Sequence, residues 1–141
     1  MNQQDLVKAG MAAAGHGAQF GPAQLQKLFF LIDREIAEKI DGSVFCFEPY
    51  DYGPFDKAVY ETAALLQLSG AVQIDNTNRF RQYSLTDSGY EEGEALLQPL
   101  NEDVEGFIRN AANWVRKVSF QEMVSSIYKQ YPDTKVNSIF R

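Results

Sequence analysis

The chain has very few of the residues from which reactive sites are usually built. It contains one cysteine, Cys46, and one histidine, His16, in 141 residues. A single cysteine cannot form an intramolecular disulfide or supply the paired cysteines of a CxxC zinc site. We interpret Cys46, which lies between two phenylalanines, as a small buried apolar residue. His16 lies in a glycine-flanked loop, where a solvated side chain is the simpler interpretation.

The sequence also lacks the short motifs of common enzyme classes. It contains no GxSxG, HExxH, P-loop or GxGxxG pattern. The glycine-rich segment GHGAQFG lacks the Lys-Ser/Thr pair of a phosphate-binding loop. We therefore expect no catalytic, cofactor-binding or metal-binding residues, and we expect that the protein is not an enzyme.

Long apolar runs and positive charge are scarce as well. No run approaches the ~18 apolar residues of a membrane span, and MNQQDLVKAG lacks the order of a signal peptide. We expect a cytoplasmic protein without membrane contact. Lys and Arg number 13 against 19 Asp and Glu, and the net charge is −6. This balance disfavours a general affinity for the phosphates of nucleic acids.

Apolar residues at spacings of three and four predict a mostly α-helical chain. The clearest helix spans about residues 22–40, with one apolar stripe formed by Leu25, Leu28, Phe29, Ile32, Ile36 and Ile40. Other helices are expected at about 4–14, from Thr86 onward, at 104–118, and after the capping box Ser119–Glu122.

Short strands are predicted between the helices. Val44–Phe47 is expected to form a buried strand, and 71–74 with 80–85 a β-hairpin. Gly53 and Pro54 are expected to begin a helix as N-cap and first helical residue. The fold class is therefore mostly α with a small β-hairpin or three-stranded sheet, in the order of a winged-helix core with a C-terminal helical extension. We expect one domain, 1–141, with the core at about 20–90 and the extension at about 91–141.

Residues 54–69 take the place of the recognition helix in this arrangement. They contain a single base, Lys57, whereas a helix that enters the major groove normally brings several Arg, Lys, Asn or Gln side chains to base edges. Arg79 and Arg81 in the hairpin are candidates to contact phosphates as a wing does, and ordinary solvated charge on a strand is the alternative interpretation of both. A winged-helix DNA-binding regulator therefore remains the alternative to a protein-binding function.

Two groups of residues are candidates for binding a protein partner. Tyr50, Tyr52 and Phe55 lie in the aromatic segment PYDYGPFDKAVY, and tyrosine is favoured at interfaces. The alternative interpretation of these aromatic residues is that they lie at the edge of the core. The second group lies in residues 86–105, which contain seven acids and no base and include Glu91, Glu92 and Glu94. The alternative interpretation of these acids is a solvated helix face. A basic partner would bind there less tightly as salt rises.

Four segments together resemble a known family. LQKLFFLID, YGPFDKAVY, LLQLSGAV and YSLTDSG, within about residues 24–90, resemble the Panacea or SocA-like family and its YwgA-type relatives. The best-matching positions are Leu25, Lys27, Leu28, Tyr52, Gly53, Pro54, Tyr60, Leu65, Gly70, Leu85, Thr86 and Gly89. The resemblance implies a non-enzymatic antitoxin- or adaptor-like domain that sequesters or presents a protein partner. The chain departs from the antitoxin pattern in its longer helical tail and in having no second antitoxin region.

Overall fold

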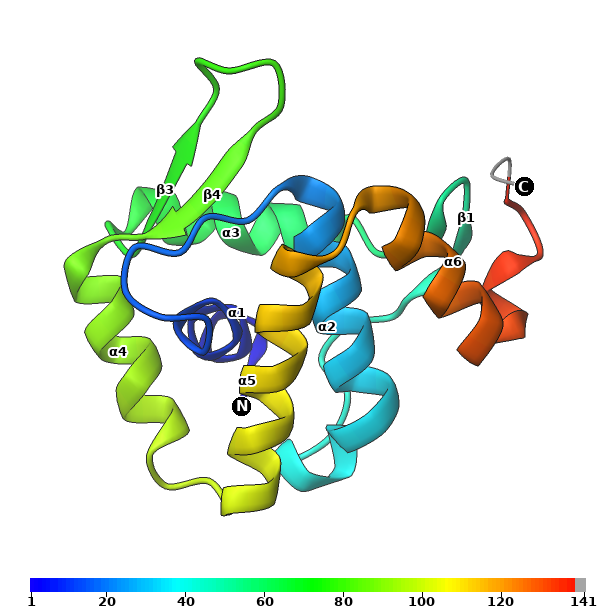
Figure 1. The fold of residues 1–141 in the computed structure, drawn as a ribbon. Helices are drawn as coiled ribbons and strands as arrows, with labels where there is room; N and C mark the ends of the chain where they lie inside the picture. Colours follow the sequence, from blue (N-terminus) through cyan, green and yellow to red (C-terminus); the bar gives the residue numbers. More distant parts are fainter. Residues whose placement is uncertain (139–141) are drawn as a thin grey trace.

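The computed structural model describes residues 1–138 and is mostly helical, with two small antiparallel hairpins (Figure 1). This confirms the predicted class of a mostly α chain with a small β-hairpin. The elements, in chain order, are α1 (Gln3–Ala12), α2 (Pro22–Ile36), η1 (Ala37–Ile40), β1 (Glu48–Tyr50), β2 (Gly53–Phe55), α3 (Ala58–Leu68), β3 (Val72–Asp75), β4 (Gln82–Leu85), α4 (Asp87–Leu97), α5 (Glu102–Lys117), α6 (Phe120–Gln130) and η2 (Pro132–Lys135).

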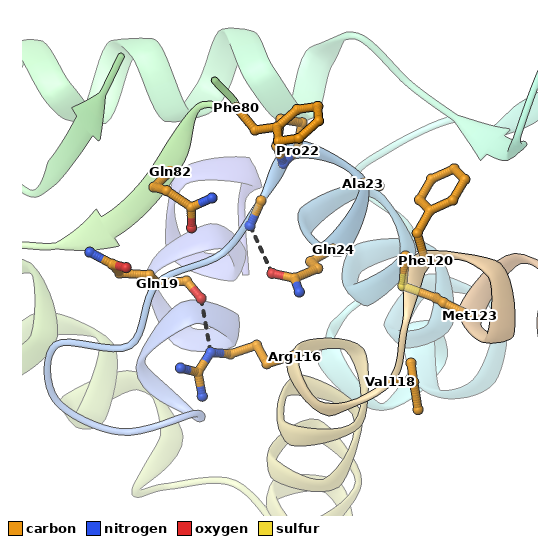
Figure 2. Close-up of a pocket in the computed structure, with 11 residues that line it drawn as sticks. Gln19, Pro22, Ala23, Gln24, Phe80, Gln82, Arg116, Val118, Phe120 and Met123 are labelled. Carbon is orange, nitrogen blue, oxygen red and sulfur yellow. Dashed lines mark hydrogen bonds between the residues drawn. The ribbon is translucent and has the colours of Figure 1, made fainter. Parts of the chain in front are cut away.

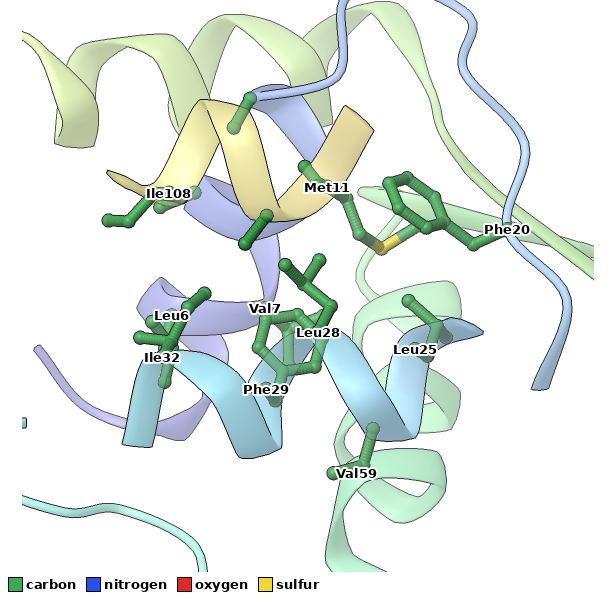
Figure 3. Packing of buried hydrophobic residues seen from close by; sticks show 14 of the residues in the cluster. Leu6, Val7, Met11, Phe20, Leu25, Leu28, Phe29, Ile32, Val59 and Ile108 are labelled. Carbon is green, nitrogen blue, oxygen red and sulfur yellow. The ribbon is translucent and has the colours of Figure 1, made fainter. Parts of the chain in front are cut away.

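Helix α2 lies at the centre of the molecule, as its broad apolar stripe predicts. It packs against α1, α3 and α5, and Figure 3 shows Leu25, Leu28 and Phe29 of α2 among the buried side chains of these neighbours. Pro22 is the first helical residue, where its missing N–H leaves no donor unsatisfied. All six residues from Leu25 to Phe30 are buried, so α2 is covered on every side in this stretch.

The hairpin β3–β4 follows α3 and projects beyond the helices (Figure 1). Val72 pairs with Leu85, and Ile74 with Tyr83. Phe20, just before α2, exchanges two backbone hydrogen bonds of 2.8 Å with Tyr83 and adds a single bridge to the hairpin. Within residues 1–138, the hairpin therefore has a single bridging residue beside it, and not a third strand. The order of elements up to this hairpin is helix, bridging residue, helix, hairpin β1–β2, helix and hairpin β3–β4.

The segment between α2 and α3 differs from the prediction. Gly53 and Pro54 do not begin a helix; they lie in β2, which pairs with β1 across the turn at Asp51 and Tyr52. Gly53 has φ of +107°, a conformation that residues with a Cβ rarely adopt, and it lets the hairpin turn. The predicted helix 54–69 is therefore shorter, beginning at Ala58.

The start of α3 is set by Asp56. Its carboxylate accepts hydrogen bonds from the backbone N–H of Ala58 at 2.9 Å and of Cys46 at 2.7 Å. The side chain of Gln26 in α2 also bonds both backbone groups of Asp56, at 2.9 Å each. These hydrogen bonds determine where α3 begins. The preference of proline for the first turn of a helix does not reveal them, because they depend on residues elsewhere in the chain.

The strand predicted at Val44–Phe47 is not formed. The segment is extended without strand pairing, although its burial alternates as expected: Phe45 is buried against Phe29, with ring centroids 6.0 Å apart. Cys46 points away from the core and is exposed, so its interpretation as a buried apolar residue was wrong. The strand pairs lie just beyond, at β1 and β2.

The C-terminal helices pack onto the core rather than apart from it. Helix α4 begins at the N-cap Thr86, whose hydroxyl accepts from the N–H of Gly89 at 3.1 Å, as predicted. It lies against α1, and a Cβ at Gly93 would be 2.4 Å from the carbonyl oxygen of Lys8. Helix α5 packs along α2. Within residues 1–138, no helix has the length and apolar character needed to cross a membrane.

Candidate functional site

Two adjoining cavities, of about 430 and 320 Å³, lie where α2 begins. They share Pro22, Ala23 and Phe120, and we call the pair the α2 groove. The larger cavity, shown in Figure 2, is also lined by Gln19, Gly21, Gln24, Phe80, Gln82, Arg116, Val118 and Met123. The smaller is also lined by Gln26, Lys27, Tyr50, Asp51, Tyr52, Gly53, Phe55 and Tyr60. Each has the volume of a ligand-sized cleft.

The predicted aromatic residues form one wall of this groove. Tyr50 stacks on Phe55 with centroids 5.1 Å apart, Phe55 meets Tyr60 at 5.8 Å, and Tyr60 stacks on Tyr83 at 6.1 Å. The line of rings runs from the exposed Tyr50, at 54% exposure, to Tyr83, at 1%. The outer rings are therefore held in place by a rigid, buried base.

Tyr52 lies within the turn between β1 and β2. Its ring meets that of Phe120 edge-on at 5.4 Å, and both side chains are more than 40% exposed. Phe120 was not among the site residues predicted from the sequence. The available signal was its place as the first residue of the helix, directly after the cap Ser119, where a side chain need not face the core.

Lys27 is a buried cation that sequence reasoning also missed as a site residue. Its side chain lines the smaller cavity, yet the residue is only 4% exposed. The ammonium donates one long hydrogen bond, 3.4 Å, to the carbonyl oxygen of Pro54. Within residues 1–138 it forms no ion pair. Burial lowers its pKa from the ordinary 10.5 to about 8, because a low-dielectric surrounding disfavours the charged form.

Arg116 lines the larger cavity. Its Nε donates to the carbonyl oxygen of Gln19 at 2.9 Å, as Figure 2 shows, and its guanidinium lies 5.7 Å from the centre of the Phe20 ring. Arg116 is exposed and forms no ion pair in the described part of the chain. The α2 groove therefore carries two cations without carboxylate partners from residues 1–138.

The acids of α4 are arranged differently. Glu92 pairs with Lys8 at 3.0 Å, and Glu94 pairs with Arg109 at 3.1 Å. Glu91 is exposed. We call Glu91, Glu92 and Glu94 the acidic strip. Two of its residues, Glu92 and Glu94, thus have intramolecular counter-charges. The strip lies on a different element from Tyr50, Tyr52 and Phe55. The structure does not join the two predicted groups into one site.

The elements that would contact DNA have little suitable chemistry. Leu65 and Leu68 are the large apolar side chains exposed on α3, at 54% and 87%. In the hairpin, Arg79 lies over the ring of Phe80 at 5.5 Å, and Phe80 is 64% exposed. Arg81 is exposed nearby. An apolar helix surface next to two arginines lacks the set of side chains with which a helix reads base edges.

Groups suited to acid–base or metal chemistry do not converge in the described residues. His16 is paired with Asp87 at 2.7 Å, and both side chains are largely exposed. Within residues 1–138, no three His, Cys, Asp or Glu side chains are placed to hold a metal ion.

Comparison of the chain with protein-family models, with curated proteins and with solved structures finds no match.

Proposed function

We propose that the protein is a non-enzymatic interaction domain, antitoxin- or adaptor-like, that holds a segment of a protein partner in the α2 groove. The observation that supports this proposal is the exposure of several aromatic side chains around one elongated depression. Tyr50 is 54% exposed and stacks on Phe55, whose ring in turn meets that of Tyr60 edge-on. Aromatic residues dominate the binding energy of protein interfaces because they bring a large, rigid contact area.

Sequestering or presenting a partner is the role that fits this site. The groove is open, is lined mainly by apolar side chains and backbone, and has no set of reactive groups among the described residues. The resemblance of LQKLFFLID and YGPFDKAVY to the Panacea family supports the same proposal, since both segments contribute to the groove.

A DNA-binding regulator is the second candidate, favoured by the order of the elements and by Arg79 and Arg81 in the hairpin. The surface of α3 argues against it. Its exposed residues include Leu65 and Leu68 with a single amide, Gln67. A helix that reads the major groove normally brings several Arg, Lys, Asn or Gln side chains to base edges. A protein that neutralised phosphates with two arginines would bind duplex weakly, and the logarithm of its affinity would fall with the logarithm of salt concentration with a slope of only about −2.

Site-specific photocrosslinking in the producing cell tests the proposal. A benzophenone amino acid is placed at Tyr50, in the groove, and in separate variants at Glu91 and Leu68. We expect one discrete protein adduct from position 50 and none from position 68. The adducted protein, purified and mixed with the chain, should bind it, and Tyr50→Ala should weaken that binding at least tenfold.

The other outcomes separate the alternatives. An adduct from position 91 alone would move the contact to the acidic strip and contradict the groove. Protection of duplex DNA at low salt, lost on replacing Arg79 and Arg81 by Gln, with no protein adduct from any position, would favour the DNA-binding regulator.

A further inference from the structure

We propose that the segment held in the α2 groove is acidic, and that one of its side-chain carboxylates sits against the ammonium group of Lys27. This inference rests on the proposed function, because it specifies the chemistry of the partner that the groove binds.

The first argument is the state of Lys27 itself. A buried ammonium normally has a carboxylate or several hydrogen-bond acceptors around it, since burying an unpaired charge is costly. Lys27 is 4% exposed and has one acceptor, the Pro54 carbonyl oxygen at 3.4 Å. Two of its three donors are therefore unused by residues 1–138. A carboxylate entering the cavity would supply the missing charge and accept charge-assisted hydrogen bonds.

The groups around Lys27 leave this position to an external anion. The cavity is lined by Tyr50, Tyr52 and Tyr60 and by Asp51, and Tyr128 of α6 approaches from the side of Gly53. Asp51 forms no ion pair with Lys27, and burial is the cause that lowers the pKa of Lys27, with no opposing carboxylate. The tyrosines are neutral at physiological pH.

The start of α2 adds a favourable field. Pro22 and Ala23, which line both cavities, form the first turn of α2. The N-terminal end of a helix carries partial positive charge. A carboxylate in the smaller cavity therefore lies near both this helix end and the buried ammonium.

The occupant is a polypeptide segment because the cavity continues. Beyond Phe120 the groove opens into the larger cavity, where Arg116 is exposed without an ion pair in the described residues. Apolar walls lie between the two cations, including Pro22 and Phe120. In a chain of net charge −6, this local surplus of cations is complementary to acidic residues alternating with apolar ones.

Nuclear magnetic resonance titration of the full chain tests this inference with two capped peptides. One is acetyl-Phe-Glu-Phe-amide and the other is acetyl-Phe-Gln-Phe-amide, which differs by one charge. We expect saturable shifts of the backbone amides of residues 23–27 and 50–55 with the Glu peptide. The Gln peptide should bind at least tenfold more weakly. Both measurements use the unaltered protein, so no variant needs to fold.

Variants and pH together locate the carboxylate. Lys27→Met should abolish the preference for the Glu peptide, whereas Lys57→Met, at an exposed lysine outside the groove, should keep it. Affinity of the unaltered protein for the Glu peptide should fall about tenfold between pH 7 and pH 9, because Lys27 loses its proton above pH 8. In Lys27→Met this pH dependence should disappear.

The failures are distinguishable. Equal binding of both peptides at the groove would overturn the carboxylate inference and leave the groove as a peptide-binding surface. Binding of 3-phenylpropionate without either peptide would also overturn it, since the occupant would then be a small carboxylate. If neither peptide binds while position 50 still crosslinks to a partner, the inference fails and the proposed function stands.

Discussion

Replacing Lys27 by methionine should stabilise the folded chain at neutral pH. The substitution keeps a long unbranched side chain in the core and removes a buried ammonium that forms no ion pair with residues 1–138. Buried charges without partners are commonly replaced by apolar residues with a gain in stability.

The magnitude follows from the pKa of Lys27. Burial lowers it from 10.5 to about 8, and each pH unit of difference corresponds to about 1.4 kcal/mol. The charged ammonium therefore destabilises the folded state by about 3 kcal/mol wherever both states are protonated. The variant leaves the Pro54 carbonyl without its hydrogen bond, which costs about 1 kcal/mol. We expect a net gain of about 2 kcal/mol at pH 7.

The same reasoning fixes the pH dependence. Below pH 8 Lys27 is protonated in both states, and the destabilisation is complete. Between pH 8 and 10.5 the unfolded state binds a proton that the folded state does not, so the stability of the unaltered protein rises with pH. The advantage of the variant should be smaller by about 1.4 kcal/mol at pH 9 than at pH 7.

Urea unfolding at pH 7, 8 and 9, followed by circular dichroism, measures both quantities for each protein. Comparing the two proteins at each pH removes the contribution of other groups, such as Tyr60, whose pKa burial raises to about 12. A difference in unfolding free energy that stays constant over this pH range would refute the reasoning, because Lys27 would then have its ordinary pKa.

Three further predictions concern helix packing, the start of α3 and the exposure of Cys46. Gly93→Ala should destabilise the protein by about 2 kcal/mol, because the new Cβ would lie 2.4 Å from a backbone carbonyl oxygen of α1. Gly106→Ala, where nothing lies within 4 Å of the new Cβ, should stabilise it by up to about 1 kcal/mol. The urea midpoints of both variants test this. Asp56→Ala should cost about 1–2 kcal/mol by removing the acceptor at the start of α3, whereas Asp56→Asn should retain most of the stability, and equal losses would contradict a capping role. Cys46 is exposed, so iodoacetamide should alkylate it in the native protein at a rate comparable to that in urea, and marked native protection, seen by mass spectrometry, would contradict the exposed position.

The regular elements were predictable because local chemistry determines them. The apolar stripe of α2, the cap Thr86 and the turn residues between β3 and β4 each act within a few residues, and the structure has the corresponding helices and hairpin. Pro132 likewise follows the end of α6 at Gln130, as is typical of proline after a helix. In these cases the interaction that forms the element joins residues close in sequence, so the sequence pattern predicts it directly.

The segment before α3 was predicted wrongly because two local rules fit Gly53 and Pro54. Proline is favoured in the first turn of a helix, and glycine is favoured where φ is positive. The choice depends on Gln26, which is 30 residues from Asp56 in sequence and bonds its backbone. A contact at that sequence distance leaves no periodic signal.

The candidate site was predictable only in part. The aromatic segment drew attention to Tyr50 and Tyr52, and both are exposed beside the groove. Lys27 gave no such signal, because a lysine in an amphipathic helix normally marks the solvated face. Its burial depends on the β1–β2 hairpin, whose Pro54 covers it, and that hairpin was itself mispredicted.

The acidic strip and the α2 groove differ in the partners that their charges already have. Glu92 and Glu94 have basic partners within the chain, so a basic protein binding there would have to displace an existing ion pair. Lys27 and Arg116 have no ion pair among residues 1–138, so an acidic segment would gain its contacts without breaking any. The gain is larger at Lys27 than at the exposed Arg116, because the dielectric around a buried charge is low and each new contact is stronger there. The net charge of −6 therefore does not identify the sign of the partner; the unpaired cations in the groove favour an acidic one.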